Sequence, residues 1–229
     1  MADFCGSGKM VCVMDWVAWH GAYEDPSSSL SARLHRVRYH LSQAIDRAPA
    51  GPVSVVSLCA GQGRDVIGVL PDHPRREDVR AVLIEADATN SALARRAAAD
   101  AGLAQVDIRQ ADASLVTSFA DALPAGVLLL CGIFGNISDR DIQRTVEAAP
   151  ALCRPGATVI WTRHRRPPDL TSRVRGWFAA SGFEEIAFDA LSTDTLTGVG
   201  VNRLRHAPAA ALPDAPLFTF GTDDPGRRR

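Results

Sequence analysis

The fold of this chain is decided by the stretch Val53-Ser-Val-Val-Ser-Leu58 and the turn Cys59-Ala60-Gly61-Gln62-Gly63-Arg64-Asp65 that follows it. The first six residues form a β-branched run that is typical of a buried strand. The two spaced glycines let the backbone turn tightly and approach a ligand. Residues 64–70 are expected to form a short helix that ends at Pro71 and points its N-terminus at that ligand.

Outward from this stretch, short apolar runs alternate with Ala- and Arg-rich helical patterns. Predicted strands cover 81–84, 106–108, 126–131 and 157–161, and predicted helices cover 89–101, 139–152 and 170–181. This alternation is typical of a parallel sheet covered by helices on both faces. Residues 183–191 and 199–204 lie too close together for a crossover helix, so we expect them to pair antiparallel. The sequence predicts an α/β fold with a seven-stranded, mostly parallel sheet and a closing antiparallel pair.

Composition divides the chain into three parts. Residues 1–51 are predicted to form a helical cap or lid, because apolar side chains recur at three- and four-residue steps between positions 30 and 45. Residues 52–205 carry the strand and helix pattern. Residues 206–229 are rich in Ala and Pro and are expected to form a flexible tail.

Charge and composition limit the classes of partner. The 229 residues are 46% hydrophobic, and 25 basic against 26 acidic side chains give a formal net charge of −1. Such a balance provides no field for a nucleic acid or an acidic membrane surface, and no apolar run approaches the length of a bilayer span. The five cysteines and six histidines show no metal-ligand spacing. We expect a cytoplasmic protein without a bound metal.

Acidic residues follow the second and third predicted strands. Glu85 comes 24 residues after Gly61, close to the spacing at which a strand-end carboxylate accepts hydrogen bonds from ribose hydroxyls. Asp112 follows the next strand, where a carboxylate can accept from the exocyclic amine of adenine. With the glycine turn, these positions predict an adenosine site.

The glycine turn, the segments 83–87 and 110–113 and the closing antiparallel pair together resemble the class I S-adenosylmethionine-dependent methyltransferases. The resemblance covers about 53–204 and implies a Rossmann-like fold with S-adenosylmethionine as cofactor. In that family the glycine turn wraps the methionine portion, the second-strand acid holds the ribose and the third-strand acid binds adenine. The implied cofactor contacts are Cys59, Gly61, Gly63, Glu85, Ala86, Asp112, Ala113, Cys131 and Gly132.

Two positions depart from the family pattern. Cys59 stands where the family often has an acid, and Asp65 stands where a third glycine is common. Arg33 or Arg64 is therefore a candidate cation for the methionine carboxylate. The fourth strand lacks the Asn/Asp-Pro-Pro-Tyr motif of many nucleic-acid and protein methyltransferases, which favours a small-molecule substrate.

The substrate side is expected beyond the carboxyl ends of the strands. Phe134 and Asn136 in the loop after the fourth strand, Arg163 after the fifth, and Trp19 and His20 near the N-terminus are the predicted substrate contacts. The aromatic cluster of residues 16–23 is either a lid over a planar substrate or a docking surface for the N-terminal helix.

Two residues are candidates for removing a proton from the substrate. His164 follows the fifth strand, and an imidazole group can exchange a proton near neutral pH; Tyr23 is the alternative. Cys59 and Cys131 each lie at the end of a predicted strand. We expect their side chains to be small buried thiols and not nucleophiles, because an apolar environment raises the pKa of a thiol.

Four functions remain open at the level of sequence. The first is methyl transfer to a small molecule. The second is another use of S-adenosylmethionine, such as cyclisation. The third is a nicotinamide-dependent oxidoreductase, against which Asp112 and the antiparallel pair argue. The fourth is a non-enzymatic binding module that has lost part of its cofactor turn, against which the two strand-end acids argue.

Overall fold

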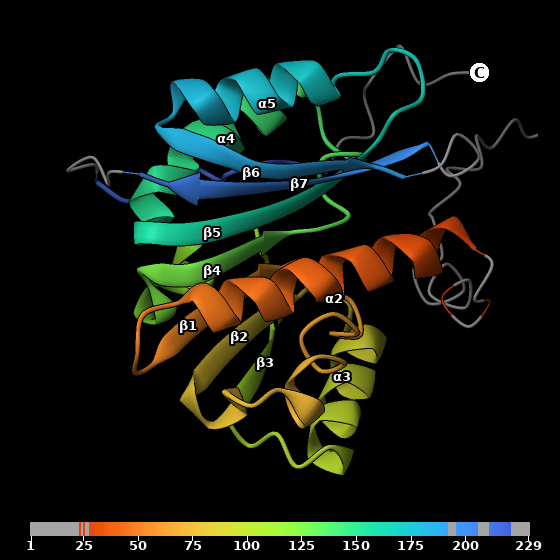
Figure 1. Ribbon diagram of the computed structural model, residues 1–229, viewed down its shortest axis with the longest axis vertical. Coiled ribbons are helices and arrows are strands. Elements are labelled where there is room, and N and C mark those ends of the chain that lie inside the picture. The colour runs from red at the N-terminus through yellow and green to blue at the C-terminus, as the bar shows by residue number, and fades with distance from the viewer. Residues whose placement is uncertain (1–22, 24, 26–27, 192–195, 206–210, 221–229) are drawn as a thin grey trace, which may run out of the picture.

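A seven-stranded sheet forms the centre of the protein in the computed structural model, which describes residues 23, 25, 28–191, 196–205 and 211–220 (Figure 1). The strand order is β3-β2-β1-β4-β5-β7-β6. The parallel strands are β1 (Val53–Leu58), β2 (Val79–Glu85), β3 (Val106–Gln110), β4 (Ala125–Leu130) and β5 (Cys153–His164). As predicted, β6 (Phe183–Ala190) and β7 (Thr197–Leu204) pair antiparallel, and β7 also runs antiparallel to β5.

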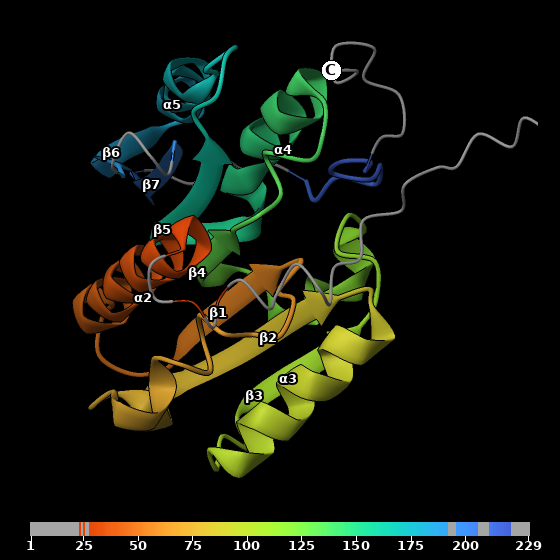
Figure 2. The same cartoon turned by 90° about the vertical axis from the view of Figure 1, so that its right-hand side faces the viewer.

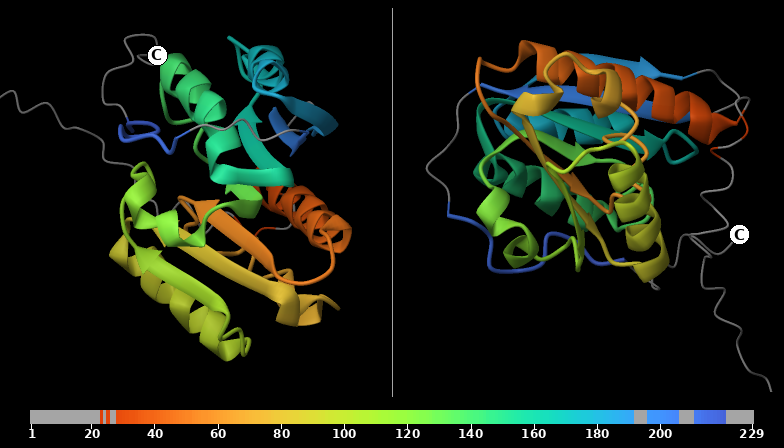
Figure 3. Two further views of the ribbon diagram at one scale, coloured as in Figure 1. Left: turned by 90° about the vertical axis from the view of Figure 1, so that its left-hand side faces the viewer. Right: turned by 90° about the horizontal axis from the view of Figure 1, so that it is seen from below.

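Helices cover both faces of the sheet and bury two separate cores (Figures 2 and 3). One face packs against α2 (Ser29–Arg47) and α3 (Ala88–Asp100), and the other against α4 (Asp139–Leu152) and α5 (Thr171–Ala180). The described residues also form four short 3-10 helices: η2 (Leu70–Asp72), η3 (Arg76–Asp78), η4 (Val116–Ser118) and η5 (Ala120–Ala122). Since β4 lies at the sheet centre with both faces covered, all of its residues are buried, as its apolar run predicts.

Within the described residues, side-chain caps start three of the four α-helices. Ser28 accepts a hydrogen bond from the Ser31 amide at the start of α2, and Ser138 caps α4 in the same way. Asp87 caps α3 and accepts from the Asn90 amide at 2.7 Å. Each cap satisfies an amide that has no partner within its own helix, which fixes where the helix begins.

The prediction of a short helix at residues 64–70 is wrong. The segment forms successive turns that lead into η2. In a helix the carbonyl of Arg64 would accept from the amide of Gly68, but here it accepts from the Arg38 guanidinium at 2.6 and 2.9 Å. That guanidinium lies against Gly68, where a Cβ atom would meet it at 2.1 Å. The glycine turn is therefore fixed from outside, by the N-terminal helix α2.

The helix α2 packs against β4, β5 and β7 and belongs to the same body as the sheet. Its C-terminal end is held by Arg75, which donates to the carbonyls of Ile45 and Ala48 at 2.7 Å. Arg38 holds its middle, as described above. These contacts place one side of α2 beside the turn that follows β1.

The C-terminal segment differs from the flexible tail expected for 206–229. Within its described part, Leu217 and Phe218 are each 1% exposed and belong to the core beneath α4. Composition predicted a tail because the surrounding residues are rich in Ala and Pro. Two large apolar side chains are enough to anchor it, since each stabilises the packed state by roughly 1.5–3 kcal/mol on burial. Among the described residues, no helix combines the length and the apolar character needed to cross a bilayer.

Candidate functional site

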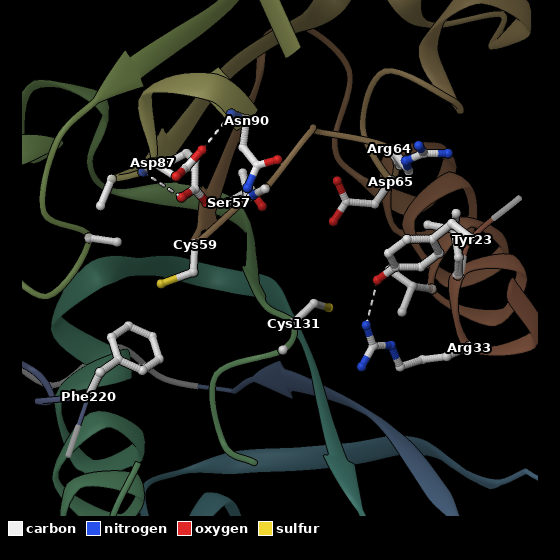
Figure 4. A pocket seen from close by; sticks show the side chains of 18 of the residues that line it. Tyr23, Arg33, Ser57, Cys59, Arg64, Asp65, Asp87, Asn90, Cys131 and Phe220 are labelled. Atoms are coloured by element: carbon white, nitrogen blue, oxygen red, sulfur yellow. Dashed lines mark hydrogen bonds between the residues drawn. The ribbon is translucent and has the colours of Figure 1, made fainter. Parts of the chain in front are cut away.

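A cavity of about 620 Å³ opens at the carboxyl ends of the central strands (Figure 4). Its wall comes from α2, the turn after β1, the ends of β2, β3 and β4, and the C-terminal segment. Of the nine positions that the resemblance implies for the cofactor, eight line it: Cys59, Gly61, Glu85, Ala86, Asp112, Ala113, Cys131 and Gly132. These residues come from four parts of the chain, and the ends of the strands bring them together in one cavity. The volume of the cavity is typical for small-molecule ligands.

The turn after β1 has three residues in the left-handed region, at alternate positions. The φ angles are 53° at Cys59, 57° at Gly61 and 66° at Gly63. Left-handed backbone favours glycine and costs other residues roughly 1–2 kcal/mol. In the structure, Cys59 is the one non-glycine residue among these three left-handed positions. Asp65, which stands where a third glycine is common in the family, lies two residues after Gly63 and is not left-handed.

Gly63 is the one implied cofactor position that does not line the cavity. A Cβ atom at Gly63 would lie 2.7 Å from the Ile67 side chain and 2.8 Å from that of Leu83. The glycine therefore allows the turn to pack on the sheet. Its assignment as a cofactor contact stays a prediction, because spacing alone does not distinguish a packing glycine from one that faces a ligand.

Glu85 at the end of β2 holds the turn and faces the cavity. Its Oε2 accepts from the Gly61 amide and its Oε1 from the Asp87 amide, both at 2.8 Å. An ionised carboxylate has about four acceptor sites, so two sites remain for hydroxyl donors of a ligand. Glu85 thus fixes the backbone of Gly61 and offers a preorganised acceptor pair.

Asp112 and Ala113 form the wall at the end of β3. One oxygen of Asp112 accepts from the Ser114 amide at 2.8 Å, which orients the carboxylate and leaves further acceptor sites. Asp87 and Asn90, at the start of α3, also line the cavity. Sequence reasoning missed these two, although the Asp-x-x-Asn spacing after a strand is a recognisable cap and marks a helix start beside the strand end.

Tyr23, Arg33, Arg64 and Asp65 form a charged cluster at the other end of the cavity (Figure 4). The Arg33 guanidinium donates to the Tyr23 hydroxyl, and Arg64 lies 5.6 Å from the centre of the Tyr23 ring. Burial raises the pKa of the Tyr23 hydroxyl above its ordinary value, against the opposing effect of Arg33. Tyr23 therefore keeps its proton at neutral pH, which argues against its predicted role as the proton acceptor.

Asp65 is the acidic member of this cluster and is buried. Burial raises the pKa of its carboxyl group, and the Val66 amide and the nearby Arg38 and Arg33 oppose that shift. One oxygen accepts from the Val66 amide at 2.8 Å. The cluster thus presents both a carboxylate and guanidinium groups within one end of the cavity.

The cysteines of the site are neutral thiols. Cys59 and Cys131 follow the adjacent strands β1 and β4, as predicted. Burial raises the pKa of both thiols well above the ordinary range, and the carboxylates of Glu85 and Asp112 add to the effect at Cys59. Since the thiolate is the nucleophile, neither side chain is suited to covalent catalysis.

The residues predicted to contact the substrate after β4 and β5 do not line the cavity. Phe134 is fully buried in the core beside Trp161, so it is not placed to contact a ligand in this cavity. Asn136 donates to the Gly132 carbonyl at 2.7 Å, and Arg163 is buried and donates to the Phe134 carbonyl. Both side chains thus hold the backbone of the loop after β4 by donating to its carbonyl groups.

His164 belongs to the end of β5, lies against Gly135 and is not among the described residues that line the cavity. Its role as proton acceptor stays a prediction. Trp19 and His20 lie outside the described residues. Among the described residues, no group of three His, Cys, Asp or Glu side chains is arranged to hold a metal ion.

Solved structures match the fold, whereas no family model and no curated protein matches the sequence. An O-methyltransferase family protein from Burkholderia thailandensis matches 84% of this chain and 60% of its own length, with 16% identity and a TM-score of 0.63. An O-methyltransferase family 2 protein from Planctomyces limnophilus DSM 3776, solved with apigenin, matches 76% of this chain and 59% of its own length, with 17% identity and a TM-score of 0.56.

The match extends to an enzyme of a different reaction type. The [4+2]-cyclase SpnF matches 72% of this chain and 81% of its own length, with 15% identity and a TM-score of 0.52. This chain spans less than two thirds of the length of the two O-methyltransferases. The strand order, the closing antiparallel pair and these matches agree: the protein has the fold of the class I S-adenosylmethionine-dependent methyltransferases.

Proposed function

We propose that this protein binds S-adenosylmethionine and transfers its methyl group to a small molecule. The observation that carries the proposal is the single cavity in which Gly61, Glu85 and Asp112 meet at three neighbouring strand ends. Glu85 would accept from both ribose hydroxyls, and Asp112 from the exocyclic amine of adenine. The backbone beside Gly61 would lie along the chain that joins ribose to sulfur.

The charged cluster would hold the amino-acid end of the cofactor. A methionine carboxylate suits the guanidinium groups of Arg33 and Arg64, and the ammonium group suits the buried carboxylate of Asp65. Opposite charges at one end of a cavity match a zwitterion better than they match either ion alone. This placement puts the sulfur atom in the middle of the cavity, beside the ends of β1 and β4.

The protein's part in methyl transfer would be alignment and exclusion of water. The cofactor supplies a methyl group on a sulfonium sulfur, and the sulfur keeps the electron pair when the bond to the methyl carbon breaks. Leu34 and Val37 of α2 line the cavity and are apolar, so they would exclude water above the reacting atoms. This is the role we assign to the N-terminal segment: a lid over the domain of 52–205.

A second candidate is a reaction that uses S-adenosylmethionine without transferring a methyl group. The described wall of the cavity contains no histidine, and its buried tyrosine keeps its proton. Its four carboxylates, Asp65, Glu85, Asp87 and Asp112, would be taken up by the cofactor or by the backbone amides that they accept from. An oxygen or nitrogen acceptor usually needs a group that takes up its proton. The fold match to a cyclase is consistent with this alternative.

Two measurements separate these proposals. Calorimetry with S-adenosylhomocysteine and with NADH tests the cofactor: binding of NADH alone would overturn both candidates. Incubation with S-adenosylmethionine that carries a trideuterated methyl group, together with a small-molecule extract of the source cells, tests the reaction. A product in which a trideuterated methyl group replaces a hydrogen of the precursor supports methyl transfer. Conversion of a substrate with no deuterium in the product and no release of S-adenosylhomocysteine supports the second candidate.

A further inference from the structure

The segment Leu217–Phe220, named here the C-terminal strap, is fixed to the domain at two places, the loop after β3 and helix α4. The Leu217 amide donates to the Ser114 carbonyl at 2.8 Å, and the Leu217 carbonyl accepts from Thr145 at 3.0 Å and from Arg144 at 3.1 Å. The Thr219 amide donates to Asp141 at 3.2 Å. The strap therefore ties the loop after β3 to helix α4.

Phe220 follows these anchors directly and lines the cavity. It forms a bridge with Ile137 in the loop after β4, and its ring contacts that of Phe218 edge-on, with centroids 5.4 Å apart. In Figure 4, Phe220 and Tyr23 lie on opposite sides of the cavity, with Cys59 and Cys131 between them. Its side chain is 48% exposed, although the two other apolar residues of the strap are buried.

An anchored aromatic ring that remains half exposed at a cavity has an uncovered apolar face. The strap is bonded to the loop after β3, which carries Asp112: the Leu217 amide donates to the Ser114 carbonyl, and Asp112 precedes Ser114 by two positions. Asp112 would read the edge of the adenine ring. Edge recognition leaves the two flat faces of the base to be covered by other groups.

We propose that Phe220 covers one face of the adenine ring, so that the C-terminal strap forms part of the cofactor site. Aromatic side chains bind bases by stacking, because every base has a flat π-face and stacking removes apolar surface from water. Ala113 and Cys59, which also line the cavity, provide small apolar surface on the domain side. This inference rests on the proposed function and adds a binding residue to it.

The test compares Phe220→Ala and Phe220→Trp with the wild-type protein in calorimetric titrations of S-adenosylhomocysteine. Loss of a base–aromatic stack predicts that Phe220→Ala raises Kd by about 5- to 150-fold, whereas Phe220→Trp keeps it within about twofold. The matched control is Leu212→Ala, which removes an apolar side chain of similar exposure, 41%, from the same tail but away from the cavity. That control should leave Kd unchanged.

A second ligand locates the contact. 5′-Methylthioadenosine has the adenosine end but no amino-acid end, so Phe220→Ala should weaken its binding by the same factor as for S-adenosylhomocysteine. Unchanged affinity for both ligands in a folded Phe220→Ala variant overturns the inference and leaves the proposed function standing. If the wild-type protein binds neither ligand, the proposed function fails, and the inference fails with it.

Discussion

Removing the Glu85 carboxylate tests the centre of the site. In Glu85→Ala, a ligand ribose would lose two charge-assisted hydrogen bonds, and the Gly61 and Asp87 amides would lose their acceptors at 2.8 Å. A hydrogen bond to a charged group contributes about 1.5–3 kcal/mol, and partial exposure reduces the sum to roughly 2–4 kcal/mol. The Kd for S-adenosylhomocysteine should therefore rise about 30- to 1,000-fold. Glu77→Ala is the matched control, since Glu77 precedes the opposite end of β2 and its side chain is 82% exposed.

A thermodynamic cycle separates ribose contact from disorder of the turn. The 2′-deoxy analogue of S-adenosylhomocysteine should bind the wild-type protein more weakly than the natural compound, by about tenfold for one hydrogen bond to a charged group. In Glu85→Ala both compounds should bind equally, because the acceptor for the hydroxyl is gone. If the variant still discriminates between them by the wild-type factor, Glu85 does not contact the ribose and the assignment of the second-strand acid is refuted.

The remaining predictions concern the turn and the charged cluster. Because burial raises the pKa of Asp65 in the folded state, its ionised form opposes folding at neutral pH, so Asp65→Asn should raise the melting temperature while weakening S-adenosylmethionine binding. That gain should shrink as the pH falls through the raised pKa toward the ordinary value of 3.8, where the wild-type carboxyl is protonated too; a constant gain across this range contradicts the reasoning. At Cys59, the left-handed φ predicts that Cys59→Gly is more stable than Cys59→Ala by about 0.5–1 kcal/mol in denaturant unfolding, and equal stability would show that the turn relaxes. Arg33→Ala should weaken S-adenosylmethionine binding about tenfold or more and leave 5′-methylthioadenosine binding unchanged, since only the former has a carboxylate for this guanidinium; equal losses in calorimetry would place Arg33 elsewhere.

Periodicity was sufficient to predict the sheet. Each predicted strand lies within an observed strand or extends it by a single residue, because a strand covered on both faces leaves an uninterrupted apolar run such as that of β4. The antiparallel closure followed from chain length alone, since the segment between β6 and β7 is too short for a crossover. What periodicity could not predict is the turn after β1. There a tertiary contact, the Arg38 guanidinium on the Arg64 carbonyl, competes with the helical hydrogen bond that local sequence favours.

The site was predictable where it depends on topology and unpredictable where it depends on side-chain direction. Glu85 and Asp112 could be placed because parallel strands end at one edge of the sheet. Phe134 follows β4 and Arg163 lies in the last residues of β5, at the same edge, yet both side chains are buried outside the cavity wall. Phe134 packs beside Trp161, and Arg163 donates to the Phe134 carbonyl. A strand-end position thus specifies the region of a residue, and only packing decides whether its side chain faces the cavity.

The N-terminal helix α2 reaches the cavity because the first crossover lacks an α-helix. Turns and two short 3-10 segments join β1 to β2, so α2 of the N-terminal segment covers that face of the sheet and brings Arg33, Leu34 and Val37 to the cavity. On the opposite side the C-terminal strap brings Phe220. A ligand in the cavity would therefore touch segments separated by almost the whole chain, and it would stabilise the folded state by holding both ends against the sheet.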